Sequence, residues 1–166
     1  MTHMQSNADL STHFKLGMRK LASTVSLITT GREGKRGGLI ATAVNSVSAE
    51  PPTLLVCVNT SASAHHLIEE NQSFCVNLLP ASYVHIAGQF SDSARRKGRF
   101  QTDEWEELLS GAPVLSAALA AFDCNVVEQI SYHSHSIFLG EIVAVKNSRE
   151  PIDPLIYLSG SFTTIR

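Results

Sequence analysis

The 166-residue sequence has little net charge, few cysteines and no long apolar run, and each absence excludes a class of protein. Thirteen Lys and Arg residues nearly balance 15 Asp and Glu residues, which leaves a net charge of −2. A basic surface for nucleic acid or for an anionic membrane is therefore not expected. No apolar run approaches the ~18 residues that indicate a membrane-spanning helix. The N-terminal stretch MTHMQSNADLS has no apolar core and no cleavage pattern, so a signal peptide is not expected.

The three cysteines, Cys57, Cys75 and Cys124, lie in apolar stretches, and none belongs to a CxxC pair. An odd number of cysteines without paired spacing favours buried, reduced thiols over a disulfide framework. The sequence therefore predicts a protein of a reducing compartment, which we expect to be the cytoplasm.

The length of the chain fits one domain. We expect a disordered lead-in over residues 1–8 and a single domain over residues 9–166. The domain is expected to start with a helix, because apolar residues recur with helical spacing at Leu10, Phe14, Met18 and Leu21.

Strand patterns fill most of the remaining chain, with short helices expected at 63–70 and 82–90 and a mobile surface loop at 91–105. Many antiparallel strands with few helices favour a mainly β fold closed into a barrel. No GxGxxG motif follows the first strand, so a dinucleotide-binding fold is not expected. A turn is expected over 31–38. The strands are expected at 24–30, 39–49, 53–59 (buried on both faces), 73–79, 119–131, 136–147 and 155–158.

Small side chains gather in the stretch 38–48. On one continuous strand, Ala41, Ala43 and Asn45 share a face, and a flat aromatic ring could lie there close to the backbone. Thr42 and Ser46 offer hydroxyl groups on the other face. By spacing alone, close packing of a helix on the sheet explains these small residues at least as well.

The stretch 58–65 runs from a buried strand into a helix start. Free backbone N–H groups, the positive end of the helix dipole and several hydroxyls predict a phosphate site there. An ordinary helix cap is the alternative interpretation. Similarly, the basic run 95–97 with Arg99 could clamp a phosphate or could be a solvated loop.

The order of these stretches resembles the flavin reductase family that has the FMN-binding split-barrel fold. The run ATAVNSVSAEPPTLLVCVNTSASAH (41–65) is followed by FCVNLL (74–79). Further ordered matches extend the resemblance over nearly the whole chain: RF (99–100), Trp105, GAPVL (111–115), FDC (122–124), HSIFLGEI (135–142) and PLIY (154–157).

This resemblance implies an NAD(P)H-dependent flavin reductase, the small component of a two-component monooxygenase. Such a protein transfers hydride from nicotinamide C4 of NADH or NADPH to N5 of FMN or FAD, and it supplies reduced flavin to a separate oxygenase. The resemblance also implies a split barrel and a homodimer with two equivalent sites near the subunit interface.

The resemblance assigns a role to each candidate residue. Residues expected along the flavin ring are Ile40, Ala41, Thr42, Ala43, Asn45, Ser46 and Asn77. Residues expected at the ribityl chain and phosphate are Val58, Asn59, Ser61, Ser63 and, from the basic run, Arg99. His135 of the HSIF motif is expected to lie near the nicotinamide and to act on it. The chain departs from many relatives at Ile40, Asn45, Ser134 and 160–163, and the last of these differences concerns the nicotinamide.

Two other functions are compatible with parts of the pattern. A flavin-binding split-barrel protein without turnover, such as a carrier or sensor, would need the same flavin contacts. A metal-dependent barrel enzyme could use His133 and His135, which would share one face of a strand. A third ligand for such a metal is not evident, so no metal is expected.

Overall fold

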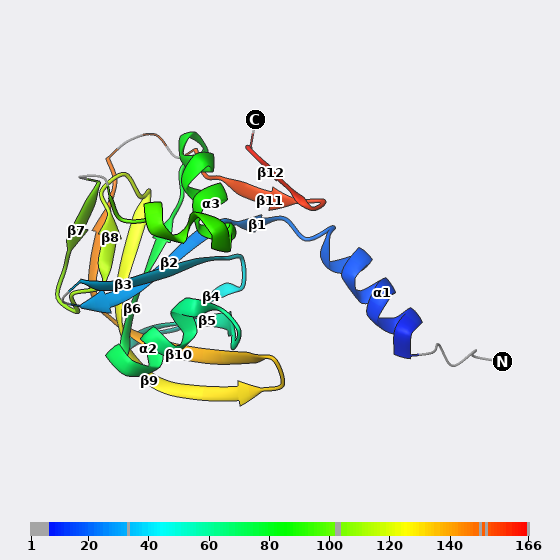
Figure 1. The fold of residues 1–166 in the computed structure, drawn as a ribbon, viewed down its shortest axis with the longest axis horizontal. Helices are drawn as coiled ribbons and strands as arrows, with labels where there is room; N and C mark the ends of the chain where they lie inside the picture. The colour runs from blue at the N-terminus through cyan, green and yellow to red at the C-terminus, as the bar shows by residue number, and fades with distance from the viewer. Residues whose placement is uncertain (1–6, 33, 102–103, 150, 152, 166) are drawn as a thin grey trace.

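A computed structural model describes residues 7–32, 34–101, 104–149, 151 and 153–165. The predicted helix is present as α1 (Asn7–Met18), which projects away from the body of the molecule (Figure 1). It begins within the stretch 1–8 that was expected to be a disordered lead-in, and residues 1–6 of that stretch lie outside the described residues. Among the described helices, none is both long and apolar enough to cross a lipid bilayer.

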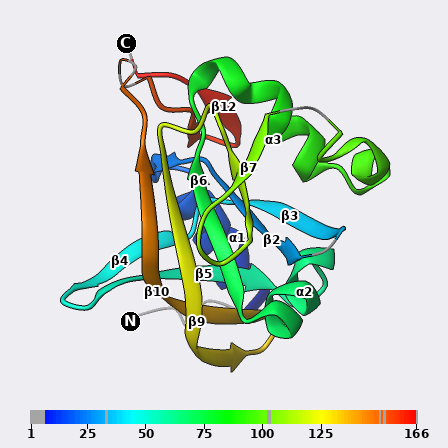
Figure 2. The same ribbon diagram turned by 90° about the vertical axis from the view of Figure 1, so that its left-hand side faces the viewer.

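The body is built on a seven-stranded sheet with the order β3-β2-β6-β9-β10-β5-β4, in which all neighbours are antiparallel. The longest neighbours, β9 and β10, lie side by side in Figure 2. This arrangement confirms the predicted mainly β, antiparallel fold with few helices. The strands are β2 (Ser26–Arg32), β3 (Lys35–Ala41), β4 (Val44–Ala49), β5 (Pro52–Asn59), β6 (Ser73–Leu78), β9 (Ala120–Tyr132) and β10 (His135–Asn147).

The two edge strands of this sheet, β3 and β4, are joined by only Thr42 and Ala43. Such a short link cannot span seven strands spaced about 4.8 Å apart, so the sheet must curl until its edges approach each other. The described strands form no ladder between β3 and β4, and the ring of hydrogen bonds is split at this point.

The prediction of one strand over 39–49 is wrong, and so is the prediction of a turn over 31–38. β3 already begins at Lys35 and pairs with β2, whereas β4 pairs with β5. Since the two halves of the stretch have different partners, the chain must bend between them. Ala41 and Asn45 therefore do not lie on one continuous strand.

The predicted short helices are confirmed as α2 (Ser63–Asn71) and α3 (Val84–Ser91). α2 packs against β2 and β3, and α3 packs against β3. Residues 102–103 of the predicted loop 91–105 lie outside the described residues. The described part is only partly irregular, because a 3₁₀-helix starts after Asp92, whose carboxylate accepts a hydrogen bond from Ala94 N. The remaining elements are β1 (Ser23–Thr24), η1 (Ala81–Tyr83), η2 (Ser93–Gly98), β7 (Trp105–Glu107), β8 (Pro113–Leu115), β11 (Ile156–Leu158) and β12 (Ser161–Thr163).

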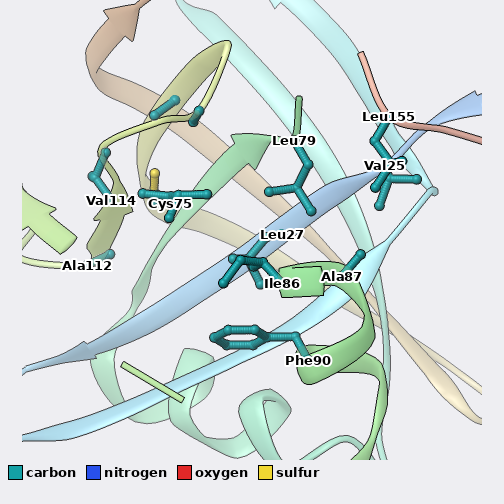
Figure 3. Close-up of a cluster of buried hydrophobic side chains, with 13 residues drawn as sticks. Val25, Leu27, Cys75, Leu79, Ile86, Ala87, Phe90, Ala112, Val114 and Leu155 are labelled. Atoms are coloured by element: carbon teal, nitrogen blue, oxygen red, sulfur yellow. The ribbon is translucent and has the colours of Figure 1, made fainter. Parts of the chain in front are cut away.

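Two buried clusters hold the elements together. In the first, Ile86, Ala87 and Phe90 project from α3 toward Leu27 of β2 (Figure 3). The second fills the sheet interior and includes Leu54, Val56 and Val58 from β5. The residues that alternate with these on β5 are only half-buried, so the prediction that this strand is buried on both faces is wrong. The half-buried side includes Cys57, which lines the cavity described next.

Candidate functional site

A cavity of about 600 Å³ opens where β3 ends. Its walls come from β3, the start of α2, the α3–η2 segment, the start of β10 and the β11–β12 hairpin. This volume lies in the range of roughly 300–1,000 Å³ that is usual for small-molecule sites. It brings together most of the residues predicted from the sequence, namely Ile40, Ala41, Thr42, Ala43, Asn59, Ser61, Ser63, Arg99 and His135.

The β3 wall ends in a bend at Thr42 and Ala43, where the chain leaves one ladder and joins the next. The carbonyl of Ala43 accepts a hydrogen bond from Cys57 N at 3.1 Å, which fixes the bend against β5. Ala41 and Ala43 each carry only a methyl group, so a flat ring can approach the main chain at this wall. The Thr42 and Ala43 side chains are exposed to the cavity.

The start of α2 offers hydrogen-bond donors to an anion. Asn59 Oδ1 accepts hydrogen bonds from the N–H and the hydroxyl of Ser61, both at 2.8 Å, and holds the turn that leads into the helix. No side chain caps the helix at Ala62. The first N–H groups of a helix lack partners within the helix, and the helix dipole favours negative charge there. Together with the Ser63 hydroxyl, this helix start fits a phosphate.

Arg99 connects three elements through backbone carbonyls. Its guanidinium donates to Gly38 O on β3, to Gln89 O and Phe90 O on α3, and to Asp92 O, and it lies 4.7 Å from the centre of the Phe90 ring. Burial lowers the pKa of this guanidinium, and nearby Arg96 adds to the effect. Most donors of Arg99 are thus occupied.

Arg96 lies one turn of η2 before Arg99 and also lines the cavity. Within the described part of the chain, no hydrogen bond or ion pair involves the Arg96 side chain. Because Arg99 is occupied and Arg96 is not, Arg96 is the better candidate to bind a phosphate. From the sequence, the whole run 95–97 with Arg99 was considered as a phosphate clamp, but only Arg99 was assigned to the site.

His135 opens β10, where it pairs with Asn59 of β5 on one side and with Tyr132 of β9 on the other. Its Nδ1 lies 3.0 Å from Ser134 Oγ. Ser134 O in turn accepts a hydrogen bond from Thr60 N at 2.9 Å. These bonds hold His135 beside the turn that begins the phosphate-binding stretch.

The prediction that His133 shares a strand face with His135 is wrong. His133 lies in the tight turn between β9 and β10, with a positive φ of 49°. Among the described residues, no group of three His, Cys, Asp or Glu side chains could hold a metal ion.

The structure places four of the predicted residues outside the cavity. Asn45 and Ser46 are exposed on β4, and Val58 is fully buried in the core. Asn77 is also fully buried, and its amide is satisfied inside the protein. It donates to Leu27 O and Thr29 Oγ1 and accepts from Leu115 N.

Sequence reasoning missed three aromatic residues that line the cavity. Phe90 projects from α3, and Tyr157 and Phe162 face each other across the β11–β12 hairpin with ring centres 5.8 Å apart. The turn of this hairpin, Ser159-Gly160, has positive φ at both residues. The Ser-Gly pair after LIYL was therefore a usable hairpin signal.

Comparison with known proteins gives consistent matches. The family described as "Flavin reductase like domain" matches residues 18–166. The FMN reductase (NADH) RutF of Acinetobacter baylyi is 41% identical over 134 residues, which cover 81% of this chain and 71% of that protein. RutF of Methylorubrum populi is 40% identical over 152 residues, with 92% and 75% covered.

Solved structures agree with this match. BorF, the flavin reductase component of a bacterial two-component tryptophan halogenase, has a TM-score of 0.85 and 30% sequence identity. The superposition covers 93% of this chain and 98% of BorF. The similarity therefore extends over the β body that forms the cavity.

Proposed function

The chain belongs to the flavin reductase like domain family, and from this premise we propose that it is an NADH-dependent FMN reductase that supplies reduced flavin to a separate oxygenase. The observation that carries the proposal is the cavity at the end of β3. It combines a flat wall of small residues, an uncapped helix start and His135. The relatives named FMN reductase (NADH) support the choice of FMN and NADH.

The lining of the cavity favours one orientation of a flavin, with its ring at the end of β3 and its phosphate at the start of α2. Ala41, Thr42 and Ala43 would lie along the ring, and Ser61 and Ser63 would hold the phosphate at the start of α2. Arg96 would neutralise part of the phosphate charge from the opposite side. Asn59 would position Ser61 and not contact the flavin itself, because its side-chain oxygen already accepts two hydrogen bonds from Ser61.

When bound, the flavin would supply the hydride acceptor and NADH the hydride, and the residues that line the cavity would hold the two rings against each other. The chain's task is to orient both rings and to keep water out. His135 would position the nicotinamide, and Tyr157 and Phe162 would close the apolar side of the cavity. No side chain of the cavity has to act as an acid or base in the hydride step.

The proposal includes a homodimer and a cytoplasmic location. No residue of α1 is buried, and its apolar side chains are exposed together with apolar residues of β9 and β10. Exposed apolar side chains are common at protein interfaces, and a second copy would cover them. Sedimentation velocity should give a dimer, and a monomer at micromolar concentration would contradict this part. The free cysteines suit a reducing compartment.

The first test follows NADH absorbance with added FMN and compares two variants of one residue. Ala43→Phe should abolish FMN binding and NADH oxidation, because the ring would occupy the flat wall of the cavity. Ala43→Gly should keep both. Unchanged activity in Ala43→Phe would contradict this placement of the flavin. FMN binding without NADH oxidation in the unmodified protein would indicate a carrier or sensor instead.

A further inference from the structure

A closed network of four polar side chains joins α2 to β9 and β10. His65 Nε2 lies 2.8 Å from Ser136 Oγ on β10, and both residues are buried. Gln129 of β9 donates from Nε2 to Glu69 Oε1 at 2.7 Å and to Ser136 Oγ at 3.3 Å. His65 Nδ1 lies 3.5 Å from Glu69 Oε2, which closes the network.

This network is surrounded by apolar packing. The His65 ring meets Phe138 edge-on with ring centres 5.4 Å apart, and Phe138 belongs to the second buried cluster. Ala64 and Ile68, which flank His65 on the same face of α2, are also buried. Apolar contacts alone tolerate small shifts of a helix on a sheet, whereas a buried polar group that shifts loses its hydrogen bond. A satisfied polar network therefore gives α2 one position on these strands.

The charge of Glu69 orients the imidazole. The hydrogen bond from Gln129 lowers the pKa of the Glu69 carboxyl, and nearby His65 and His66 act in the same direction against the effect of burial. Beside this carboxylate, a neutral imidazole places its one N–H at Nδ1. His65 Nε2 then accepts a hydrogen bond from the Ser136 hydroxyl.

Both ends of the His65–Ser136 contact lie next to the cavity wall. His65 follows two residues after Ser63, which the proposed function assigns to the flavin phosphate. Ser136 follows His135, and because side chains alternate along a strand, His135 lines the cavity while Ser136 is buried. A shift of α2 relative to β10 would therefore move the phosphate donors away from the rest of the lining.

We propose that His65 is a positioning residue for the flavin phosphate, because its hydrogen bond with Ser136 holds the start of α2 against β10. The inference rests on the proposed function, which places the phosphate at this helix start. His65 is not one of the residues that line the cavity, so it acts through the helix and not by contact with the flavin. Riboflavin has the ring and the ribityl chain of FMN but no phosphate, so its binding does not depend on this contact.

Equilibrium titration of the full-length protein with oxidised FMN and with riboflavin tests the inference. Ser136→Ala removes the hydroxyl that His65 contacts. It should weaken FMN binding about tenfold, the effect of losing one charged hydrogen bond, and leave riboflavin binding unchanged. His65→Leu, a change of similar volume, should act in the same direction. His65→Gln keeps an amide that can reach Ser136 and should retain most of the affinity for FMN.

Thr30→Val is the matched control for the loss of a buried hydrogen bond. Thr30 is fully buried outside the cavity lining, and its hydroxyl donates to Ser73 O at 2.7 Å. Thr30→Val and Ser136→Ala should both lower stability in urea, but only Ser136→Ala should change the ratio of FMN affinity to riboflavin affinity. Ser136→Ala removes a single oxygen atom, so it decides the test should His65→Leu fail to fold.

Unchanged FMN affinity in Ser136→Ala would overturn the inference. Equal weakening of FMN and riboflavin would also overturn it, because that result indicates a purely structural role, as would an equal loss of FMN affinity in His65→Gln and His65→Leu. An unmodified protein that binds FMN no more tightly than riboflavin would contradict both the proposed placement of the phosphate and this inference. The titrations need no turnover, so absence of NADH oxidation alone would contradict the proposed function and not this inference.

Discussion

Asn77 illustrates at the residue scale how a motif residue can support a site without touching it. Its amide makes three hydrogen bonds inside the core, to Leu27 O, Thr29 Oγ1 and Leu115 N. Asn77→Ala would remove three buried hydrogen bonds, so we expect the free energy of unfolding to fall by about 1–3 kcal/mol. Urea denaturation measures this loss. FMN affinity of the folded variant should be unchanged, and a large loss of affinity with normal stability would place Asn77 at the flavin.

His135 should affect the nicotinamide more than the chemical step. It lines the cavity at the start of β10 and is held beside Asn59 by strand pairing. His135→Ala should raise the KM for NADH more than it lowers kcat, because a positioning contact contributes mainly to binding. Steady-state rates at saturating FMN measure the two parameters. His133→Ala, in the neighbouring turn and outside the cavity lining, is the control, and a His135→Ala variant with both parameters unchanged would refute the assignment.

Cys57 should differ from the other two cysteines in its reaction with a thiol reagent. Burial raises the pKa of Cys124 to about 12 and that of Cys75 well above its usual value, and Asp123 adds to both shifts. Neither thiol forms the reactive thiolate near pH 8, whereas Cys57 is half-buried and lines the cavity. One thiol per chain should therefore react in the native protein, and saturating FMN should protect it. Cys57→Ser should remove this reaction, and labelling that FMN does not slow would contradict the placement.

At the scale of single elements, the sequence predicts strands that have a residue pattern of their own, but it does not predict strand boundaries that depend on pairing with distant strands. The β-branched and apolar runs of β2, β6, β9 and β10 carry their own signal, and these strands were expected. The break between β3 and β4 has no local signal, because it results from pairing with β2 on one side and β5 on the other. The three-residue strands β7, β8 and β12 were missed, whereas β11, which is equally short, lies in the apolar run 155–158 and was expected.

Gly140 in β10 tests the packing of these elements. A Cβ at this position would lie 2.5 Å from Phe74 Cζ and 2.8 Å from Cys124 Cβ, inside a fully buried cluster. Gly140→Ala should therefore lower the free energy of unfolding by about 1–3 kcal/mol through overpacking. Gly88→Ala in α3 is the matched control, because no atom lies within 4 Å of its new Cβ and alanine favours helix by up to about 1 kcal/mol. Equal stability of both variants in urea would contradict the packing described here.

At the scale of the whole molecule, the cavity is assembled from segments that are far apart in the sequence. The wall at 40–43 and the helix start at 59–63 each lie in one short, unusual stretch, but the resemblance to flavin reductases was needed to assign them to a flavin site. Phe90 and Phe162 were missed, because nothing near them in the sequence shows that α3 and the last hairpin fold toward β3. Asn45 and Val58 were assigned from the family resemblance, but Asn45 is exposed on β4 and Val58 is buried in the core, so neither lines the cavity.

The central claim is that this cavity brings NADH and FMN together for hydride transfer. The most direct measurement mixes the protein with equimolar NADH and FMN in the absence of oxygen and records the absorbance of both compounds. The account predicts that both bands are lost together, one NADH for each FMN, at a rate proportional to protein concentration. The loss should slow strongly in Ala43→Phe and persist in Ala43→Gly. A rate that does not exceed that of the mixture without protein would contradict the account.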